Sequence, residues 1–232
     1  MTYVFPPPAL PSLPVAGSSE RYAVRRVYCV GRNYAAHARE MGFDPDRDPP
    51  FFFAKPADAV VAVLPGATAE IPYPSATQDY QHEIELVVAI GRAGADIDVS
   101  RALDHAWGYA VGLDMTRRDL QLALRNKGCP WEPGKAFDAS APIGPITPAA
   151  QVPGVDKAAI WLAVNGIERQ RATIDHLIWN IAETIAHLSK YFRLAPGDLI
   201  FTGTPEGVGK VVLGDMLVGG IDGLGEISVR IV

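Results

Sequence analysis

Short apolar stretches bounded by glycine, proline, asparagine or aspartate recur along most of the chain. Stretches of this length in this setting are typical of β-strands. The Asn165-Gly166 pair follows one of them and predicts a type I′ hairpin, because both residues tolerate a positive φ. The stretches that we expect to form strands are residues 22–30, 51–54, 84–90, 107–113, 159–164, 199–202 and 226–232.

A helical repeat is clear only between residues 175 and 192. Apolar residues recur there at intervals of three and four, and Pro196-Gly197 ends the segment. This pattern predicts one long amphipathic helix. Because strands outnumber helices and do not alternate with them regularly, we expect a β-rich α+β fold with short peripheral helices. Those shorter helices are expected at residues 33–41, 100–107 and 116–125.

Five prolines among the first fourteen residues exclude a helix at the N-terminus and favour an extended arm, packed on the body or on a partner subunit. We expect residues 1–20 to form this arm and residues 21–232 to form one domain. Of the 232 residues, 48% are hydrophobic, which is enough for a substantial core. This composition excludes a disordered chain.

The net charge and the hydropathy of the chain limit the kinds of partner, such as nucleic acid or a membrane, that it can bind. With 21 basic and 26 acidic residues the net charge is -5, so no broad cationic surface is expected and nucleic acid is not an expected partner. The longest uncharged stretch, residues 140–155, contains four prolines and is too short to span a membrane. Cys29 and Cys129 are far apart and the N-terminus lacks the features of a signal peptide, so we expect a cytoplasmic protein without membrane partners.

Glu83 and Glu85 alternate with apolar residues on an expected strand, so their side chains project from the same face. Two like charges side by side repel unless a cation lies between them. Asp114 follows the next apolar strand and would complete an all-oxygen site suited to Mg²⁺ or Mn²⁺, whereas Zn²⁺ would be expected to recruit Cys or His. The same alternation is also typical of an ordinary half-buried strand, so both interpretations stay open.

His37 and Glu40 share one face of the expected helix 33–41, where a carboxylate can orient an imidazole for general base chemistry. A solvated surface pair is the alternative. The chain has no GxSxG motif, and neither cysteine has a nucleophile signature. If the protein is a hydrolase, water must therefore be its nucleophile.

The glycine-rich segment TGTPEGVGK, residues 202–210, invites comparison with a phosphate-binding loop. Thr204 stands where that motif needs glycine and Val211 where it needs a hydroxyl, so nucleotide binding is not expected. The segment is then either a turn-rich connection between two strands or a loop that faces a ligand. In the second case the N–H groups of Gly203 and Gly207 and the Thr204 hydroxyl would approach an anionic group.

Six of these segments, taken together and in order, resemble the fumarylacetoacetate hydrolase family. Each motif is short, but six in the family's order make a chance similarity improbable, and the resemblance covers roughly residues 21–232. The matching stretches are VGRNYAAHARE (30–40), FFFAKP (51–56), YQHEIELVVAIG (80–91), GYAVGLDMTRRDLQ (108–121), GKAFDASAPIGP (134–145) and DLIFTGTPEGVG (198–209).

The resemblance implies a mixed β-roll, similar to a β-sandwich, that usually forms a homodimer. It implies a Mg²⁺ or Mn²⁺ centre held by Glu83, Glu85 and Asp114 in a catalytic domain of residues 21–232. His37 and Glu40 would then be the dyad that activates water, and Lys135 would be a further catalytic group. The positions that match substrate contacts in the family are Arg32, Lys55, Arg118, Gln121 and Thr204.

Within the family the chain is similar to the small acylpyruvate hydrolases, and its proline-rich arm resembles that of fumarylpyruvate hydrolases. This implies hydrolysis of the C3–C4 bond of a 2,4-dioxo acid through a metal-stabilised pyruvate enolate, with fumarylpyruvate of the gentisate pathway of aromatic catabolism as substrate. Arg32 and Arg117 are the candidates to bind its distal carboxylate. The alternatives are oxaloacetate decarboxylation or hydroxymuconate isomerisation at the same centre and, more remotely, a non-catalytic module that binds dicarboxylates.

Overall fold

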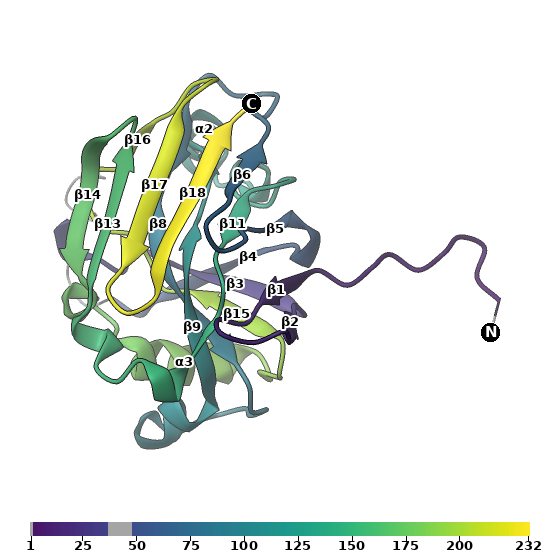
Figure 1. The fold of residues 1–232 in the computed structure, drawn as a ribbon, viewed down its shortest axis with the longest axis vertical. Coiled ribbons are helices and arrows are strands. Elements are labelled where there is room, and N and C mark those ends of the chain that lie inside the picture. Colours follow the sequence, from purple (N-terminus) through teal and green to yellow (C-terminus); the bar gives the residue numbers. More distant parts are fainter. Residues whose placement is uncertain (1, 37–47) are drawn as a thin grey trace.

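The computed structural model describes residues 2–36 and 48–232. Two large β-sheets pack face to face, and helix α3 (Ile181–Tyr191) lies at one end of the sandwich (Figure 1). The smaller of the two sheets consists, in order, of β14 (Ile167–Thr173), β13 (Ala159–Val164), β17 (Met216–Ile221), β18 (Gly225–Ile231) and β6 (Thr68–Ile71).

The larger sheet has eight strands and mixed directions. The pairings β15–β3 and β11–β5 are parallel, and the others are antiparallel. This sandwich of mixed sheets confirms the predicted fold class. The strands of the larger sheet are β4 (Phe51–Lys55), β3 (Arg26–Gly31), β15 (Asp198–Phe201), β8 (Ile84–Ile90), β9 (Ala106–Leu113), β11 (Ala141–Ile143) and β5 (Val60–Ala62), with β12 (Thr147–Pro148) also paired with β9.

Minor sheets and short helices make up the rest of the secondary structure of the described residues. One minor sheet pairs β1 (Ser12–Pro14) with β2 (Arg21–Ala23), and another orders β10 (Thr116–Arg117), β7 (Tyr80–His82) and β16 (Gly209–Lys210). The remaining helices are α2 (Arg118–Asn126) and the 3-10 turns η1 (Ala57–Ala59), η2 (Val99–His105), η3 (Glu132–Gly134), η4 (Ala149–Gln151), η5 (Val155–Lys157) and η6 (Ile174–His176).

The longer predicted strands are confirmed, and two of them, β8 and β13, have the predicted bounds. The hairpin after β13 has Asn165 at φ 53° and Gly166 at φ 78°, as a type I′ turn requires. The prediction of one strand over residues 22–30 is wrong. The chain changes partners at Val24 and Arg25, because β2 pairs with β1 whereas β3 pairs with β15 and β4.

The helix predictions were less accurate at their N-terminal ends. Helix α3 begins at Ile181 rather than at residue 175, because Asn180 caps it in a capping box with Glu183. The expected helix over 100–107 is the 3-10 turn η2, and the one over 116–125 begins at Arg118, after the short strand β10. The expected helix over 33–41 lies largely outside the described residues.

Strand β8 is buried along its whole length, because both of its faces are covered. Its even-numbered residues, among them Leu86 and Val88, pack into the core between the two large sheets. Its odd-numbered residues Val87 and Ala89 pack on the opposite face, in a second cluster that includes Phe201. This second face also carries the polar residues at the start of the strand.

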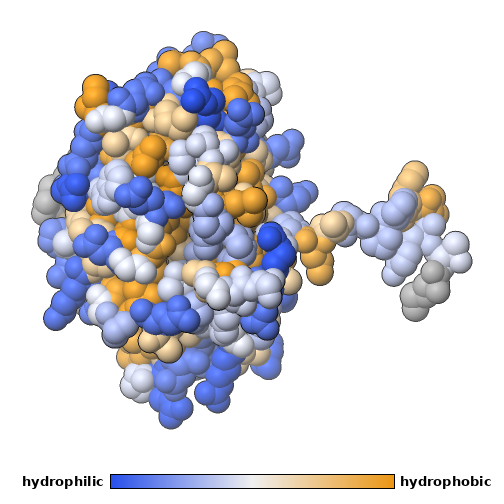
Figure 2. All heavy atoms as spheres, viewed as in Figure 1, coloured by the Kyte–Doolittle hydropathy of each residue, from blue (hydrophilic) through white to orange (hydrophobic). Residues whose placement is uncertain are grey.

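The N-terminal residues 2–11 extend away from the body of the molecule (Figure 1). Figure 2 shows hydrophobic side chains on this arm, clear of the rest of the surface. They include Val4, which is 92% exposed, and Phe5, which is 79% exposed. Among residues 2–36 and 48–232, no helix combines the length and the apolar character needed to cross a membrane.

Candidate metal centre

The antiparallel register of β8 and β9 brings the three predicted carboxylates together. Glu85 lies opposite Gly112 and Ile84 opposite Leu113, and the Asp114 N–H donates to the Glu83 carbonyl at 2.8 Å. Because side chains alternate between faces, Asp114 projects to the same side of the sheet as Glu83 and Glu85. Two residues from one strand and one from the end of its neighbour thus meet in space.

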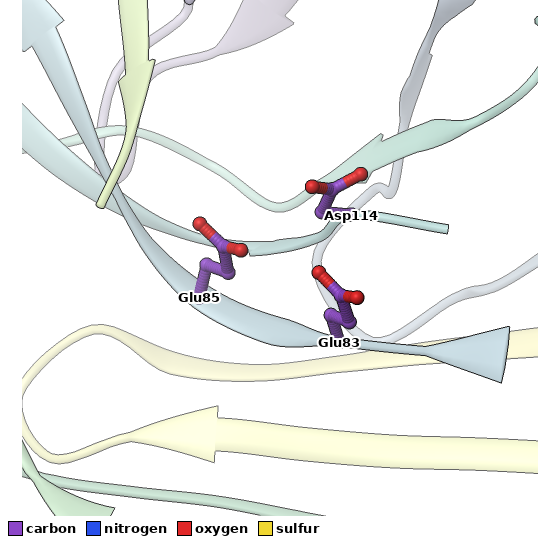
Figure 3. A group of neighbouring side chains, drawn as sticks. All are labelled: Glu83, Glu85 and Asp114. Atoms are coloured by element: carbon purple, nitrogen blue, oxygen red, sulfur yellow. The ribbon is translucent and has the colours of Figure 1, made fainter. Parts of the chain in front are cut away.

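The three carboxylates point toward one another (Figure 3). One oxygen from each lies within 4.8 Å of the others, and all three side chains are buried. The exposed fraction is 5% for Glu83 and 1% for Glu85 and for Asp114. Three carboxylates buried this closely need compensating positive charge, because Coulomb repulsion is strong where water is excluded.

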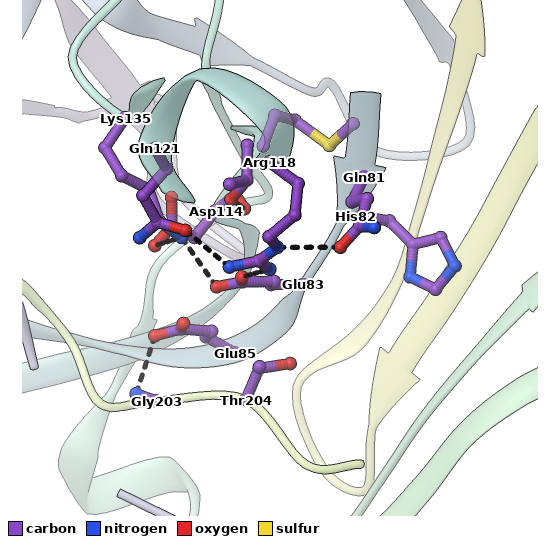
Figure 4. Close-up of polar contacts among 12 residues, drawn as sticks. Gln81, His82, Glu83, Glu85, Asp114, Arg118, Gln121, Lys135, Gly203 and Thr204 are labelled. Atoms are coloured by element: carbon purple, nitrogen blue, oxygen red, sulfur yellow. Dashed lines mark hydrogen bonds and ion pairs between the residues drawn. The ribbon is translucent and has the colours of Figure 1, made fainter. Parts of the chain in front are cut away.

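Part of that charge comes from two lysines and an arginine, and Figure 4 shows Lys135 and Arg118 among them. Lys135 Nζ donates to Glu83 Oε2 and to Asp114 Oδ2, each at 2.7 Å. Lys55 Nζ lies 2.8 Å from Asp114 Oδ1, and the Arg118 guanidinium forms an ion pair with Glu83. These contacts arrange a basic shell around Glu83 and Asp114.

Glu85 has a different environment from the other two carboxylates. Its Oε2 accepts a hydrogen bond from the Gly203 N–H at 2.6 Å. Burial, followed by the charges of Asp114 and Glu83, raises the pKa of Glu85 well above its ordinary value. The Glu85 side chain therefore holds a proton readily until a further cation favours its ionised form.

These residues fit a hard divalent cation. The Asp114 Oδ1 atom is buried, and Lys55 Nζ lies 2.8 Å from it. Carboxylate oxygens are the ligands that Mg²⁺ and Mn²⁺ prefer. Burial and the repulsion of its two neighbours raise the pKa of Glu85, and a cation among the three carboxylates would offset both effects.

A buried network behind the site, which the sequence did not indicate, is centred on Gln170 of β14. Its Oε1 accepts from the Ile84 N–H at 3.1 Å, and its Nε2 donates to Thr204 Oγ1 at 2.8 Å. The Thr204 hydroxyl in turn donates to the Ile84 carbonyl at 2.8 Å. Both backbone polar groups of Ile84, the residue between Glu83 and Glu85, are thus held by side chains.

We expect Gln170→Leu to destabilise the protein, because the leucine leaves the buried Ile84 N–H without its acceptor. The free energy of unfolding should fall by about 1–3 kcal/mol, measured by chemical denaturation. Gln151→Leu is the control, because Gln151 is exposed on η4. Equal stability of the two variants would show that Gln170 does not hold the strand.

A pocket of about 250 Å³ opens beside the carboxylates. Five other predicted site residues line it: Arg32, Arg118, Gln121, Lys135 and Thr204. Arg118 Nη1 donates to Gln121 Oε1 at 2.6 Å, which fixes both polar groups on the pocket wall. Gly203 and Thr204 line the pocket, so the glycine-rich segment is a connection between β15 and β16 that faces the site.

Two of the predicted site residues do not line this pocket, and two others lie outside the described part of the chain. Lys55 is buried behind the carboxylates, where Nζ also donates to the Met115 carbonyl, rather than on the pocket wall. Arg117 is not a pocket residue, because its guanidinium stacks over Phe137 at 4.3 Å. His37 and Glu40 lie outside the described residues.

The outer pocket wall is aromatic and basic. Phe51, Phe53 and Trp131 line it, with Trp131 packed edge-on against both phenylalanines. Arg125 also lines it. None of these four had been predicted as a site residue, although the FFF run of β4 was visible as a motif.

Comparisons with known proteins agree with this geometry. Residues 26–232 match the family model described as fumarylacetoacetate hydrolase, C-terminal. A fumarylpyruvate hydrolase of Ralstonia sp. is 48% identical over 78% of this chain and 92% of its own, and a mitochondrial oxaloacetate tautomerase of Arabidopsis thaliana is 41% identical over 88% and 89%. The crystal structure of fumarylpyruvate hydrolase from Pseudomonas aeruginosa with Mn²⁺ and pyruvate has 63% identity and a TM-score of 0.98, covering 100% of this chain and 99% of that one.

Proposed function

The chain belongs to the fumarylacetoacetate hydrolase family, and on that basis we propose that it is a metal-dependent hydrolase that cleaves a carbon–carbon bond of an acylpyruvate. The proposed substrate is fumarylpyruvate, and the products are fumarate and pyruvate. The observation that carries this proposal is the cluster of Glu83, Glu85 and Asp114 at the wall of a pocket that also presents Lys135 and Arg118.

In this proposal Glu83, Glu85 and Asp114 hold Mg²⁺ or Mn²⁺. The bound ion supplies Lewis acidity toward the carboxylate and 2-keto oxygens of the pyruvyl group. The solved Pseudomonas aeruginosa relative, which contains Mn²⁺ and pyruvate, supports this assignment. The three buried carboxylates of this chain, an all-oxygen donor set, support it independently.

In the proposed cycle the Lys135 ammonium first balances the charge of two carboxylates and then stabilises negative charge on the substrate. Burial lowers its pKa, but the charges of Asp114 and Glu83 outweigh burial, so the net shift is upward and the ammonium stays protonated. It stands between two of the proposed ligands. When those oxygens bind a cation, its N–H groups become available to the substrate, where they stabilise negative charge that develops on the 2-oxygen.

Arg118 and Gln121 orient the substrate from the first turn of α2. The guanidinium is held by Glu83 and by Gln81 Oε1 at 2.8 Å, so its direction is fixed before substrate binds. A fixed cation of this kind positions the pyruvyl carboxylate with little loss of side-chain entropy.

Water is the nucleophile of the proposed reaction. His37, oriented by Glu40, takes one proton from a water molecule, and the resulting hydroxide adds to the C4 carbonyl of the substrate. The C3–C4 bond then breaks and its electron pair stays with the pyruvyl fragment as the enolate. C3 finally takes up the proton that His37 had accepted, which gives pyruvate and the free acid of the acyl group and regenerates the base.

A three-substrate assay tests the proposal. Purified protein with Mg²⁺ should cleave fumarylpyruvate faster than acetylpyruvate, and EDTA should abolish both reactions. Oxaloacetate is the third substrate because a relative at 41% identity is an oxaloacetate tautomerase, which favours keto–enol chemistry on oxaloacetate as the second candidate function. Turnover of oxaloacetate alone would establish that second function and overturn the first.

We further propose that the protein is a cytoplasmic homodimer of the gentisate pathway of aromatic catabolism. The exposed apolar arm, with Val4 and Phe5 in solvent, supports contact with a second copy, and a solution mass of twice 24.9 kDa would establish the dimer. The free thiols Cys29 and Cys129, the latter exposed, suit a reducing compartment. The pathway follows from the proposed substrate.

A further inference from the structure

One face of α2 runs from the carboxylate cluster toward the outer pocket. Arg118, Gln121 and Arg125 follow one another at intervals of three and four residues, so they share that face, and all three line the pocket. Arg118 is buried against Glu83, whereas Gln121 and Arg125 are half-buried. The helix therefore presents a second cation, Arg125, two turns beyond the first.

The spacing of these two arginines exceeds the length of the proposed substrate by only a few ångströms, a gap that the long arginine side chains can close. Seven residues of an α-helix rise about 10 Å along its axis. Six carbon–carbon bonds separate the terminal carbons of an extended seven-carbon 2,4-dioxo dicarboxylate, which places its two carboxylates roughly 7–8 Å apart at ordinary bond lengths. A substrate held by Arg118 at one end can thus reach Arg125 with the other.

Arg32 adds a cation to the same outer region. Its guanidinium stacks over Phe51 at 5.3 Å, and its φ of 58° lies in the left-handed region that is unfavourable for a non-glycine residue. The next residue, Asn33, anchors this conformation, because its Nδ2 donates to the Thr202 carbonyl at 2.8 Å and to the Trp179 carbonyl at 2.9 Å. The backbone is thus fixed where it presents Arg32 to the pocket.

The two outer arginines act on each other electrostatically. Burial, followed by the charge of Arg125, lowers the pKa of Arg32, while Asp48 raises it. The Arg32 guanidinium stays protonated at neutral pH, since the ordinary pKa of arginine is far higher. Two like charges on one pocket wall are stabilised when an anion binds between them, as a carboxylate would do.

We propose that Arg125, together with Arg32, binds the distal carboxylate of the substrate and makes the enzyme selective for dianionic 2,4-dioxo acids over monoanionic ones. This inference rests on the proposed function and deepens it, because it adds the recognition of the acyl group to that of the pyruvyl group. The aromatic wall formed by Phe51 and Trp131 lies beside this contact.

The test compares fumarylpyruvate with acetylpyruvate, which lacks the distal carboxylate. Arg125→Gln should lower kcat/KM for fumarylpyruvate about 10- to 100-fold, chiefly through KM, since a charge-assisted hydrogen bond is lost. The same variant should leave kcat/KM for acetylpyruvate within about twofold of the wild-type value, since no contact with that substrate is lost. Lys127→Gln is the matched control, because it removes an exposed charge next to the C-terminus of α2 without touching the pocket.

The outcomes separate this inference from the proposed function. Equal losses on both substrates, or no loss on fumarylpyruvate, would overturn the role of Arg125 while cleavage by the wild type upholds the function. A wild-type protein that cleaves neither substrate would overturn both. If Arg125→Gln does not fold, Arg32→Gln tests the same carboxylate site with the same two substrates and the same criteria.

Discussion

We expect Glu85→Gln to abolish acylpyruvate cleavage and to weaken Mn²⁺ binding strongly. The amide keeps the shape of the side chain and can still accept the Gly203 N–H, but it removes one anionic oxygen ligand from the cluster. Loss of Lewis acidity worth several kcal/mol corresponds to a fall in kcat of at least about a thousandfold. Turnover assays and Mn²⁺ titration followed by electron paramagnetic resonance measure the two effects.

Relative to the metal-free wild type, the metal-free Glu85→Gln protein should become more stable as the pH rises. Because the pKa of Glu85 is raised in the folded chain, the folded state holds a proton that the unfolded state has already lost. The free energy of unfolding of the wild type therefore decreases with increasing pH between the unfolded and the folded pKa, by about 1.4 kcal/mol per pH unit. Glu85→Gln lacks this group and its contribution to the slope.

Denaturation of the metal-free proteins from the ordinary glutamate pKa of 4.5 upward checks this expectation. Glu70→Gln is the control, since Glu70 is exposed on a strand away from the pocket and should not change the pH dependence. A Glu85→Gln protein that binds Mn²⁺ as the wild type does, and unfolds with the same pH dependence, would exclude Glu85 from the metal centre.

We expect His37→Ala to reduce acylpyruvate cleavage by about a hundredfold to ten-thousandfold, because the general base that activates water is removed. Oxaloacetate decarboxylation needs no activated water, so any such activity of the wild type should survive. Steady-state kinetics on both substrates measure the difference. His176→Ala is the control, since His176 is exposed in the turn η6 before α3.

Two results would contradict the proposed role of His37 as the base that activates water. Cleavage at the wild-type rate in His37→Ala would mean that another group activates water. Loss of both activities, with Mn²⁺ affinity unchanged, would mean that His37 serves a step common to the two reactions rather than the addition of water.

The centre of the site was predictable because it depends on local periodicity. Glu83 and Glu85 alternate along one strand, which fixes their common face, and Asp114 follows the next long strand. An antiparallel pairing of two sequential apolar strands is the simplest connection, and the structure has it. The position of all three carboxylates thus followed from short-range pattern and one pairing.

The rest of the site depends on contacts between distant segments. Gln170 lies in a strand whose neighbours in sequence are mostly exposed, so its burial arises only when β14 packs behind Thr204. Lys55 and Arg117 carry the charge expected of cleft residues, but tertiary packing turns one behind Asp114 and the other onto Phe137. Composition and spacing contain no signal for either outcome.

Anomalous scattering from crystals grown with Mn²⁺ and pyruvate tests the central claim most directly. We expect one strong manganese peak bounded by carboxylate oxygens of Glu83, Glu85 and Asp114, with pyruvate beside it in the pocket. Crystals that show no peak among these three side chains with Mn²⁺ in excess would contradict it.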